Sequence, residues 1–136
     1  MEDDQLTDGL ARTLGFTYDD VSADRVVLSW TVDERHTQPY GIVHGGVHCA
    51  AVESTASVGA AVWFGERGKV VGIANHTNFL RAAGPGDRLT ATATPIHRGR
   101  LQQLWQVEIT DALGRLVARG EVRLQNLAAS DSRTAQ

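Results

Sequence analysis

The stretch from residue 41 to residue 57, GIVHGGVHCAAVESTAS, combines groups that can act on a carbonyl compound. Gly45 and Gly46 stand where an apolar helix is expected to begin, so their amides would be unpaired and would carry positive partial charge. Glycines also let a ligand approach closely, and such a helix start can polarise a carbonyl or stabilise an oxyanion. Glu53, a lone carboxylate among small apolar residues, is suited to act as a general base or a nucleophile.

Helical geometry separates these two features within one chain. Gly45 and Glu53 would lie about 12 Å apart along the axis of a helix that rises about 1.5 Å per residue. His44 would point to the side opposite Glu53, whereas Ser57 would share the face of Glu53. A site that uses both the helix start and the carboxylate therefore needs two copies of the helix. Antiparallel copies across a two-fold axis would create two identical sites.

Other interpretations of this stretch stay open. Glu53 would be an ordinary solvated side chain if its helix face is exposed, and HGG also occurs at ordinary loop-to-helix junctions. His44 and His48 have the spacing of a metal-binding pair, but Glu53 is out of phase as a third ligand, so we expect no metal site. Cys49 is more typical of a small buried thiol than of a nucleophile. Ser57 lies outside a nucleophile-elbow motif, and the glycine spacing fits neither standard phosphate-binding loop.

The whole chain has the composition of an ordinary globular domain. It has 136 residues, 42% of them hydrophobic and 21% charged, and a formal net charge of −3, which predicts one domain and no nucleic-acid partner. The single cysteine excludes an intrachain disulfide. The sequence shows no apolar run of membrane-spanning length, and its acidic start lacks the regions of a signal peptide. We therefore expect a cytoplasmic protein with no membrane partner.

The pattern along the chain predicts one long helix among antiparallel strands. Helical periodicity covers about residues 4–14 and 45–64. Alternation predicts roughly five strands, at 25–32, 70–80, 87–97, 102–110 and 115–124, with a further short candidate at 16–21. The last four strands are joined by short connections, which indicates an α+β fold with the helix packed on one face of the sheet. Because the helix is apolar nearly all round, we expect the sheet or a partner to wrap it. Residues 1–126 would form the domain and 127–136 a loose tail.

Several motifs occur together in one known family. They are QPYGIVHGG at 38–46, AVESTAS at 51–57, NFLR at 78–81 with GD at 86–87, HRGR at 97–100 and DALGRL at 111–116. HGG alone is a weak signal, but HGG with a glutamate nine residues after the histidine and with the downstream NFLR and GD is a strong one. Over about residues 14–125 the chain resembles hotdog-fold acyl-CoA thioesterases of the phenylacetate-pathway, hydroxybenzoyl-CoA and 1,4-dihydroxy-2-naphthoyl-CoA type.

The resemblance implies a fold and a role for each matching residue. The fold would be a curved antiparallel sheet wrapped around one long central helix, in a homodimer with shared active sites that often pairs into a tetramer. The carboxylate matching Glu53 attacks the thioester or activates water for that attack, and the N–H matching Gly45 polarises the thioester carbonyl. Residues matching Gln38 and His44 help to orient the thioester and its leaving sulfur. The hydroxyl matching Ser57 lies near the nucleophile or the water.

The implied substrate is an acyl-CoA, hydrolysed to a carboxylic acid and coenzyme A without a separate cofactor. Arg81 is the first candidate for the phosphates of coenzyme A, with Arg98 and Arg100 as second candidates. Aryl-specific relatives often have a histidine at the position of Phe79, and His76 on the opposite strand face cannot replace it. Phe79 therefore favours apolar or unsubstituted groups, and both an aryl and an aliphatic acyl group stay open. The substrate-binding positions taken together are Gly46, Asn78, Phe79, Arg81, Arg98 and Arg100.

Two other functions stay open at this stage. A hotdog hydratase or dehydratase on acyl thioesters would pair a histidine with an acidic residue in a different motif, so the HGG–glutamate pattern favours hydrolysis. The other alternative is a non-catalytic protein that binds acyl-CoA.

Overall fold

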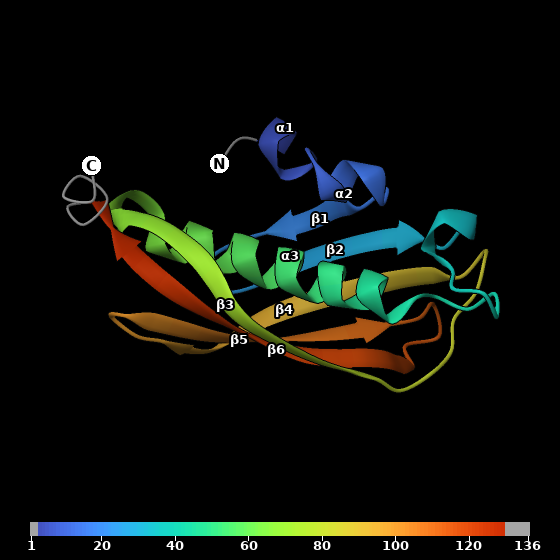
Figure 1. Ribbon diagram of the computed structural model, residues 1–136. Helices are drawn as coiled ribbons and strands as arrows, with labels where there is room; N and C mark the ends of the chain where they lie inside the picture. Colours follow the sequence, from blue (N-terminus) through green and yellow to red (C-terminus); the bar gives the residue numbers. More distant parts are fainter. Residues whose placement is uncertain (1–2, 130–136) are drawn as a thin grey trace.

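The structure, a computed structural model, describes residues 3–129 and lays one long helix, α3 (Gly45–Phe64), across a curved sheet (Figure 1). Two four-residue helices, α1 (Asp3–Leu6) and α2 (Leu10–Thr13), lie near the N-terminus, and two short 3-10 helices, η1 (Glu34–His36) and η2 (Gly65–Arg67), flank α3. The strands are β1 (Thr17–Val21), β2 (Val26–Thr31), β3 (Gly68–Phe79), β4 (Arg88–Arg98), β5 (Gln102–Thr110) and β6 (Leu116–Ala128).

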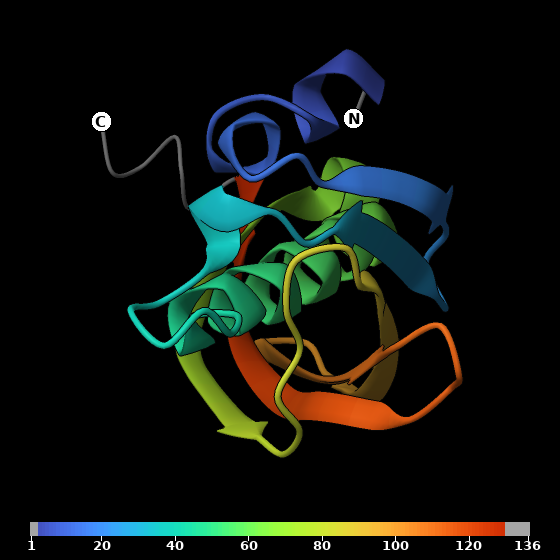
Figure 2. The same ribbon diagram turned by 90° about the vertical axis from the view of Figure 1, so that its right-hand side faces the viewer.

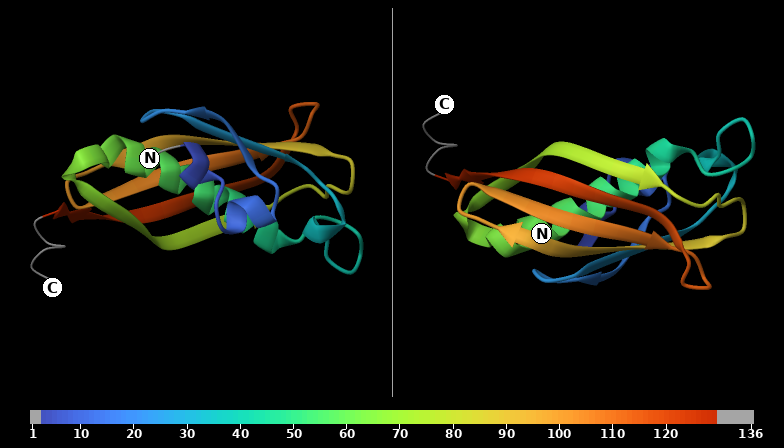
Figure 3. Two further views of the ribbon diagram at one scale, coloured as in Figure 1. Left: turned by 90° about the horizontal axis from the view of Figure 1, so that it is seen from above. Right: turned by 90° about the horizontal axis from the view of Figure 1, so that it is seen from below.

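The sheet has the strand order β1-β2-β4-β5-β6-β3, and every neighbouring pair is antiparallel. Helix α3 follows β2 in the chain and leads to β3 at the opposite edge of the sheet, so it crosses the concave face (Figures 2 and 3). Strand β3 pairs with β6 along its whole length, with an irregularity between Gly72 and Ala74. Its other side is a free edge, to which no strand within residues 3–129 pairs.

One side of α3 packs into the core of the sheet. Trp105 of β5 is fully buried, and a Cβ added at Gly59 of α3 would lie 2.6 Å from its ring, so only glycine permits this approach. The indole N–H of Trp105 donates to the side chain of Gln103 at 2.8 Å, which in turn donates to Asn126 at 2.8 Å. The core therefore has its polar atoms paired at this point, as burial requires.

The α+β fold with a central helix is confirmed, and one detail of the sequence prediction is wrong. The helix expected over residues 4–14 is two short helices, because Gly9 adopts a φ of 64° between them. The short strand candidate at 16–21 is confirmed as β1, which pairs with β2 and makes the sheet six-stranded. Strand β6 continues to Ala128, beyond the expected domain end at residue 126. Most of the expected tail, residues 130–136, lies outside the described residues.

No helix within residues 3–129 combines the length and the apolar character needed to cross a membrane.

Candidate active site

The start of α3 leaves one backbone donor free. His44 is the N-cap, and its Nδ1 accepts a hydrogen bond from the Gly46 N–H at 2.7 Å. The Val47 N–H donates to the His44 carbonyl at 2.9 Å. The Gly45 N–H has no partner within residues 3–129. It is therefore a donor, strengthened by the dipole of a twenty-residue helix, that a ligand can use.

A hollow of about 320 Å³ lies against this donor. It gathers residues from four segments: the loop before α3, the first turn of α3, the end of β3 and the loop after β3. Four of the expected site residues line it together, namely Gln38, Gly45, Phe79 and Arg81. Phe79 lies so close that a Cβ at Gly45 would be 2.5 Å from its ring, so a larger residue there would displace this exposed ring.

Gln38 is held in position by the turn that follows it. Its backbone carbonyl accepts from the Gly41 N–H at 2.8 Å, and its side-chain oxygen accepts from the Tyr40 N–H. The side-chain NH2 of Gln38 has no partner within the described part of the chain. The hollow is therefore lined by residues with two unused donors, the Gln38 amide and the Gly45 N–H, which suits a carbonyl oxygen.

Asn78 and Arg81 lie exposed at the end of β3 and just after it. The Arg81 N–H donates to the Val117 carbonyl at 3.1 Å, which fixes its backbone beside β6. Its guanidinium forms no ion pair with any residue of 3–129. Arg81 thus offers an unused positive charge at the mouth of the hollow.

Glu53 lies on the side of α3 that the sheet leaves uncovered. Its side chain is exposed, and Ser57 one turn later is partly exposed on the same face. Gly72 of β3 lies beside it, where an added Cβ would be 3.9 Å from the Glu53 carboxyl carbon. Glu53 does not line the hollow at Gly45. Within one chain the carboxylate and the helix start are therefore separate, as the helical phase predicts.

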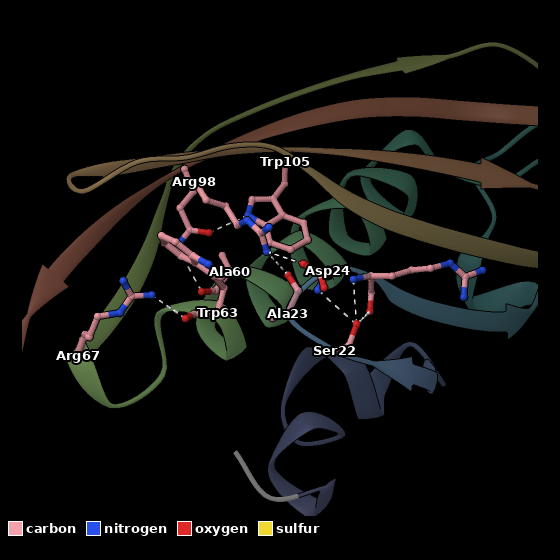
Figure 4. Close-up of polar contacts among 10 residues, drawn as sticks. Ser22, Ala23, Asp24, Ala60, Trp63, Arg67, Arg98 and Trp105 are labelled. Atoms are coloured by element: carbon pink, nitrogen blue, oxygen red, sulfur yellow. Dashed lines mark hydrogen bonds and ion pairs between the residues drawn. The ribbon is translucent and has the colours of Figure 1, made fainter.

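The basic turn, residues 97–100, lies at the end of α3 opposite the Gly45 hollow. The Arg98 guanidinium donates to the Ala23 carbonyl at 2.9 Å and pairs with Asp24 at 2.8 Å, and it lies 5.5 Å from the Trp63 ring (Figure 4). Arg98 and Arg100 line a second hollow of about 450 Å³ there. The structure therefore does not bring these two arginines to the Gly45 hollow of the same chain.

His48 is a site residue that the sequence argument did not include. It lines the Gly45 hollow and is only 3% exposed. Its ring lies between two aromatic rings, with centroid distances of 6.4 Å to Trp30 and 5.9 Å to Phe79. Burial lowers the pKa of His48 to about 4, so the ring is neutral at pH 7. The available signal was its position three residues after Gly45, which places both on one side of the helix.

This buried imidazole makes stability depend on pH. The pKa of His48 is about 4 in the folded chain and about 6.5 when unfolded, so the unfolded chain binds more protons between these values. Its contribution to the free energy of unfolding is complete above pH 6.5 and falls by up to about 3 kcal/mol as the pH drops to 4. We expect His48→Phe to flatten the pH dependence of the urea unfolding midpoint in that range. The exposed His97 provides the control His97→Phe, and equal slopes in wild type and His48→Phe would contradict the assignment.

Known proteins resemble this chain in sequence and in structure. The thioesterase superfamily matches residues 40–118. A Mycobacterium tuberculosis protein with the provisional name of an esterase is 48% identical over 119 residues, which are 85% of this chain and 84% of that protein. The 1,4-dihydroxy-2-naphthoyl-CoA hydrolase of Escherichia coli is 35% identical over 103 residues, 76% of this chain and 75% of the hydrolase. The crystal structure of S. sahachiroi AziG has a TM-score of 0.87 and 53% identity, covering 88% of this chain and 97% of AziG.

Proposed function

This chain belongs to the thioesterase superfamily and is a thioester hydrolase with the hotdog fold, and we propose that it hydrolyses an acyl- or aroyl-CoA to the carboxylic acid and coenzyme A. The observation that carries the proposal is the unused N–H of Gly45 at the start of α3, a residue that lines a hollow together with Gln38. Donors arranged in this way suit a thioester carbonyl, whose oxygen gains negative charge as the carbon is attacked.

The proposed reaction uses Glu53 from a second chain. Its carboxylate either attacks the carbonyl carbon or takes a proton from a water that attacks it. In both routes the C–S bond breaks and the sulfur leaves as coenzyme A thiolate, which then takes a proton. Direct attack leaves an acyl anhydride on Glu53, and water hydrolyses it to the acid and the free carboxylate. Gln38 and His44 would orient the thioester and its sulfur, with Ser57 near the water or the nucleophile.

The second chain would come from a homodimer built on the free edge of β3. That edge spans twelve residues and displays exposed apolar side chains, including Val71 and Ile73. Pairing two such edges around a two-fold axis would continue the sheet and cover the exposed faces of both α3 helices. Glu53 would then approach the partner's helix start. Two dimers would pair into the tetramer, and the arginines at the far end of α3, Arg98 and Arg100, could reach coenzyme A phosphates across a subunit boundary.

The test of the reaction is thiol release from a panel of thioesters. The panel contains benzoyl-, hydroxybenzoyl-, dihydroxynaphthoyl-, phenylacetyl- and fatty acyl-CoA, with a no-substrate control for the thiol of Cys49. We expect hydrolysis of at least one member, and the best substrate names the acyl class. If folded, oligomeric protein releases no thiol from any member, the activity proposed here is wrong. Hydration of an enoyl-CoA or binding without turnover would then be measured.

The proposed dimer can be tested by substituting two isoleucines that are exposed to a similar degree. Ile73 on the β3 edge is 50% exposed and Ile96 on the interior strand β4 is 48% exposed. We expect Ile73→Lys to convert the protein to monomers, because it places two charges near the two-fold axis, and to abolish activity with them. Ile96→Lys should leave the β3-edge dimer intact. Light scattering checks the mass against 14.7 kDa for one chain, and a fully active monomer would overturn the shared site.

A further inference from the structure

We infer that His48 selects the substrate: its imidazole forms a hydrogen bond with a hydroxyl or oxo oxygen on the acyl group, close to the thioester. The inference rests on the proposed function, because it places that acyl group in the hollow beside Gly45. It also changes the substrate class. Phe79 and His76 alone favour an apolar or unsubstituted acyl group.

The position of His48 supports a contact with the acyl group. It lies three residues after Gly45, and side chains on a helix tilt toward its N-terminus, so the ring extends back toward the free Gly45 N–H. Phe79 is shared by both residues, since its ring packs on Gly45 and its centroid is 5.9 Å from that of His48. A thioester carbonyl held at the Gly45 N–H would therefore place the next atoms of the acyl group between the imidazole and the Phe79 ring.

The hydrogen-bonding atoms of the His48 ring have no partners in the described part of the chain. Neither ring nitrogen of His48 has a hydrogen-bond partner within residues 3–129, and Nδ1 is fully shielded from solvent. The indole N–H of Trp30, whose ring flanks the same imidazole, is also buried without a partner. Such groups are rare in folded proteins, because a buried polar group that stays unpaired destabilises the fold.

A second buried histidine in the same chain shows what a structural imidazole looks like. His36 is 0% exposed, and both of its ring nitrogens are bonded. Its Nδ1 accepts from the Asp33 N–H at 2.9 Å, and its Nε2 lies 2.7 Å from the Leu14 carbonyl oxygen. His48 is buried to a similar degree but has neither bond. The difference indicates that the partner of His48 arrives from outside the chain, through the hollow.

A neutral imidazole offers one donor and one acceptor, and a hydroxyl can use either. An acyl group without oxygen would leave His48 Nε2 unpaired, whereas a hydroxylated one would pair this less shielded nitrogen. This asymmetry is the usual basis of strong discrimination between substrates that differ by one hydroxyl. The oxygen can stand on an aromatic ring or on an alkyl chain, since both present the same group to the imidazole.

The test compares matched thioesters. One set is benzoyl-CoA with its 2-, 3- and 4-hydroxy derivatives, and the other is hexanoyl-CoA with 3-hydroxyhexanoyl-CoA. For wild type we expect kcat/KM of at least one hydroxylated member to exceed that of its parent by about tenfold or more. We expect His48→Phe, which keeps a ring but has no nitrogens, to lower that ratio by about tenfold. His48→Asn, which keeps hydrogen-bonding atoms, should retain part of the preference.

The outcomes separate this inference from the proposed function. If wild type hydrolyses none of the thioesters, the proposed function falls and the inference with it. If it hydrolyses them without preferring any hydroxylated member, only the inference is overturned, and this result needs no variant. The same follows if His48→Phe keeps the wild-type ratio, which would assign His48 to a bound water. His48→Met serves as the variant without nitrogens if the phenylalanine proves too large to fold.

Discussion

Glu53→Gln is expected to lower kcat/KM for thioester hydrolysis by about 10²–10⁴-fold while leaving the protein folded. The substitution removes the charge that a base or nucleophile needs and changes the side-chain volume very little. Glu53 is exposed in the single chain, and it has no hydrogen bond or ion pair within residues 3–129 that the amide would break. The rate of thiol release from one acyl-CoA measures the decrease in kcat/KM. The midpoint of thermal unfolding shows whether the variant is folded.

A matched substitution shows whether the loss belongs to this carboxylate. Glu108 is exposed on β5, a strand that β6 separates from β3, so Glu108→Gln removes the same charge from the protein away from the proposed site. It should keep nearly full turnover. Near-normal turnover by Glu53→Gln would remove Glu53 from the chemistry and favour the interpretation that it is only a solvated side chain.

Much of the fold could be predicted because particular residues in the sequence indicate where helices begin and end. The start of α3 follows from the HGG stretch and its end from Gly65, which has a φ of 58°. The separation of Gly45 from Glu53 needed only the helical repeat, and the structure places them apart in one chain as expected. These features depend on local sequence, where backbone conformation and side-chain periodicity leave few alternatives.

Local sequence does not predict which distant segment covers a given face of a helix. Features of the site that depend on this covering could therefore not be predicted. The sequence placed His48 on the same side of the helix as Gly45, but the hollow exists because the end of β3 and the loop after it come back beside the helix start. The basic turn is a similar case. Its position beside Trp63, and the pairing of Arg98 with Asp24, follow from the strand order, which periodicity does not define.

Gly45→Pro is expected to lower kcat/KM by about 10²–10³-fold relative to Gly45→Ala. Gly45 is the first residue of α3, where proline is favoured, and His44 before it already has the extended ψ of 135° that a residue preceding proline adopts. Both substitutions add a Cβ that meets the exposed ring of Phe79, so Gly45→Ala controls for that contact. Only proline removes the N–H. Equal activities of the two variants would exclude this N–H as the group that polarises the carbonyl.

A dimer that combines one Glu53→Gln chain with one Gly45→Pro chain shows whether the carboxylate and the helix start of one site come from different chains. If Glu53 acts on the partner's helix start, a dimer of one Glu53→Gln chain and one Gly45→Pro chain has one site with both groups intact and one with neither. Statistical mixing makes about half of the dimers mixed, so coexpression should restore about a quarter of wild-type activity. If each site used groups from a single chain, every site would lack one group and the mixture would stay inactive. Recovery of activity from two inactive chains would thus require a shared site, because no rearrangement within either chain can supply the missing atom.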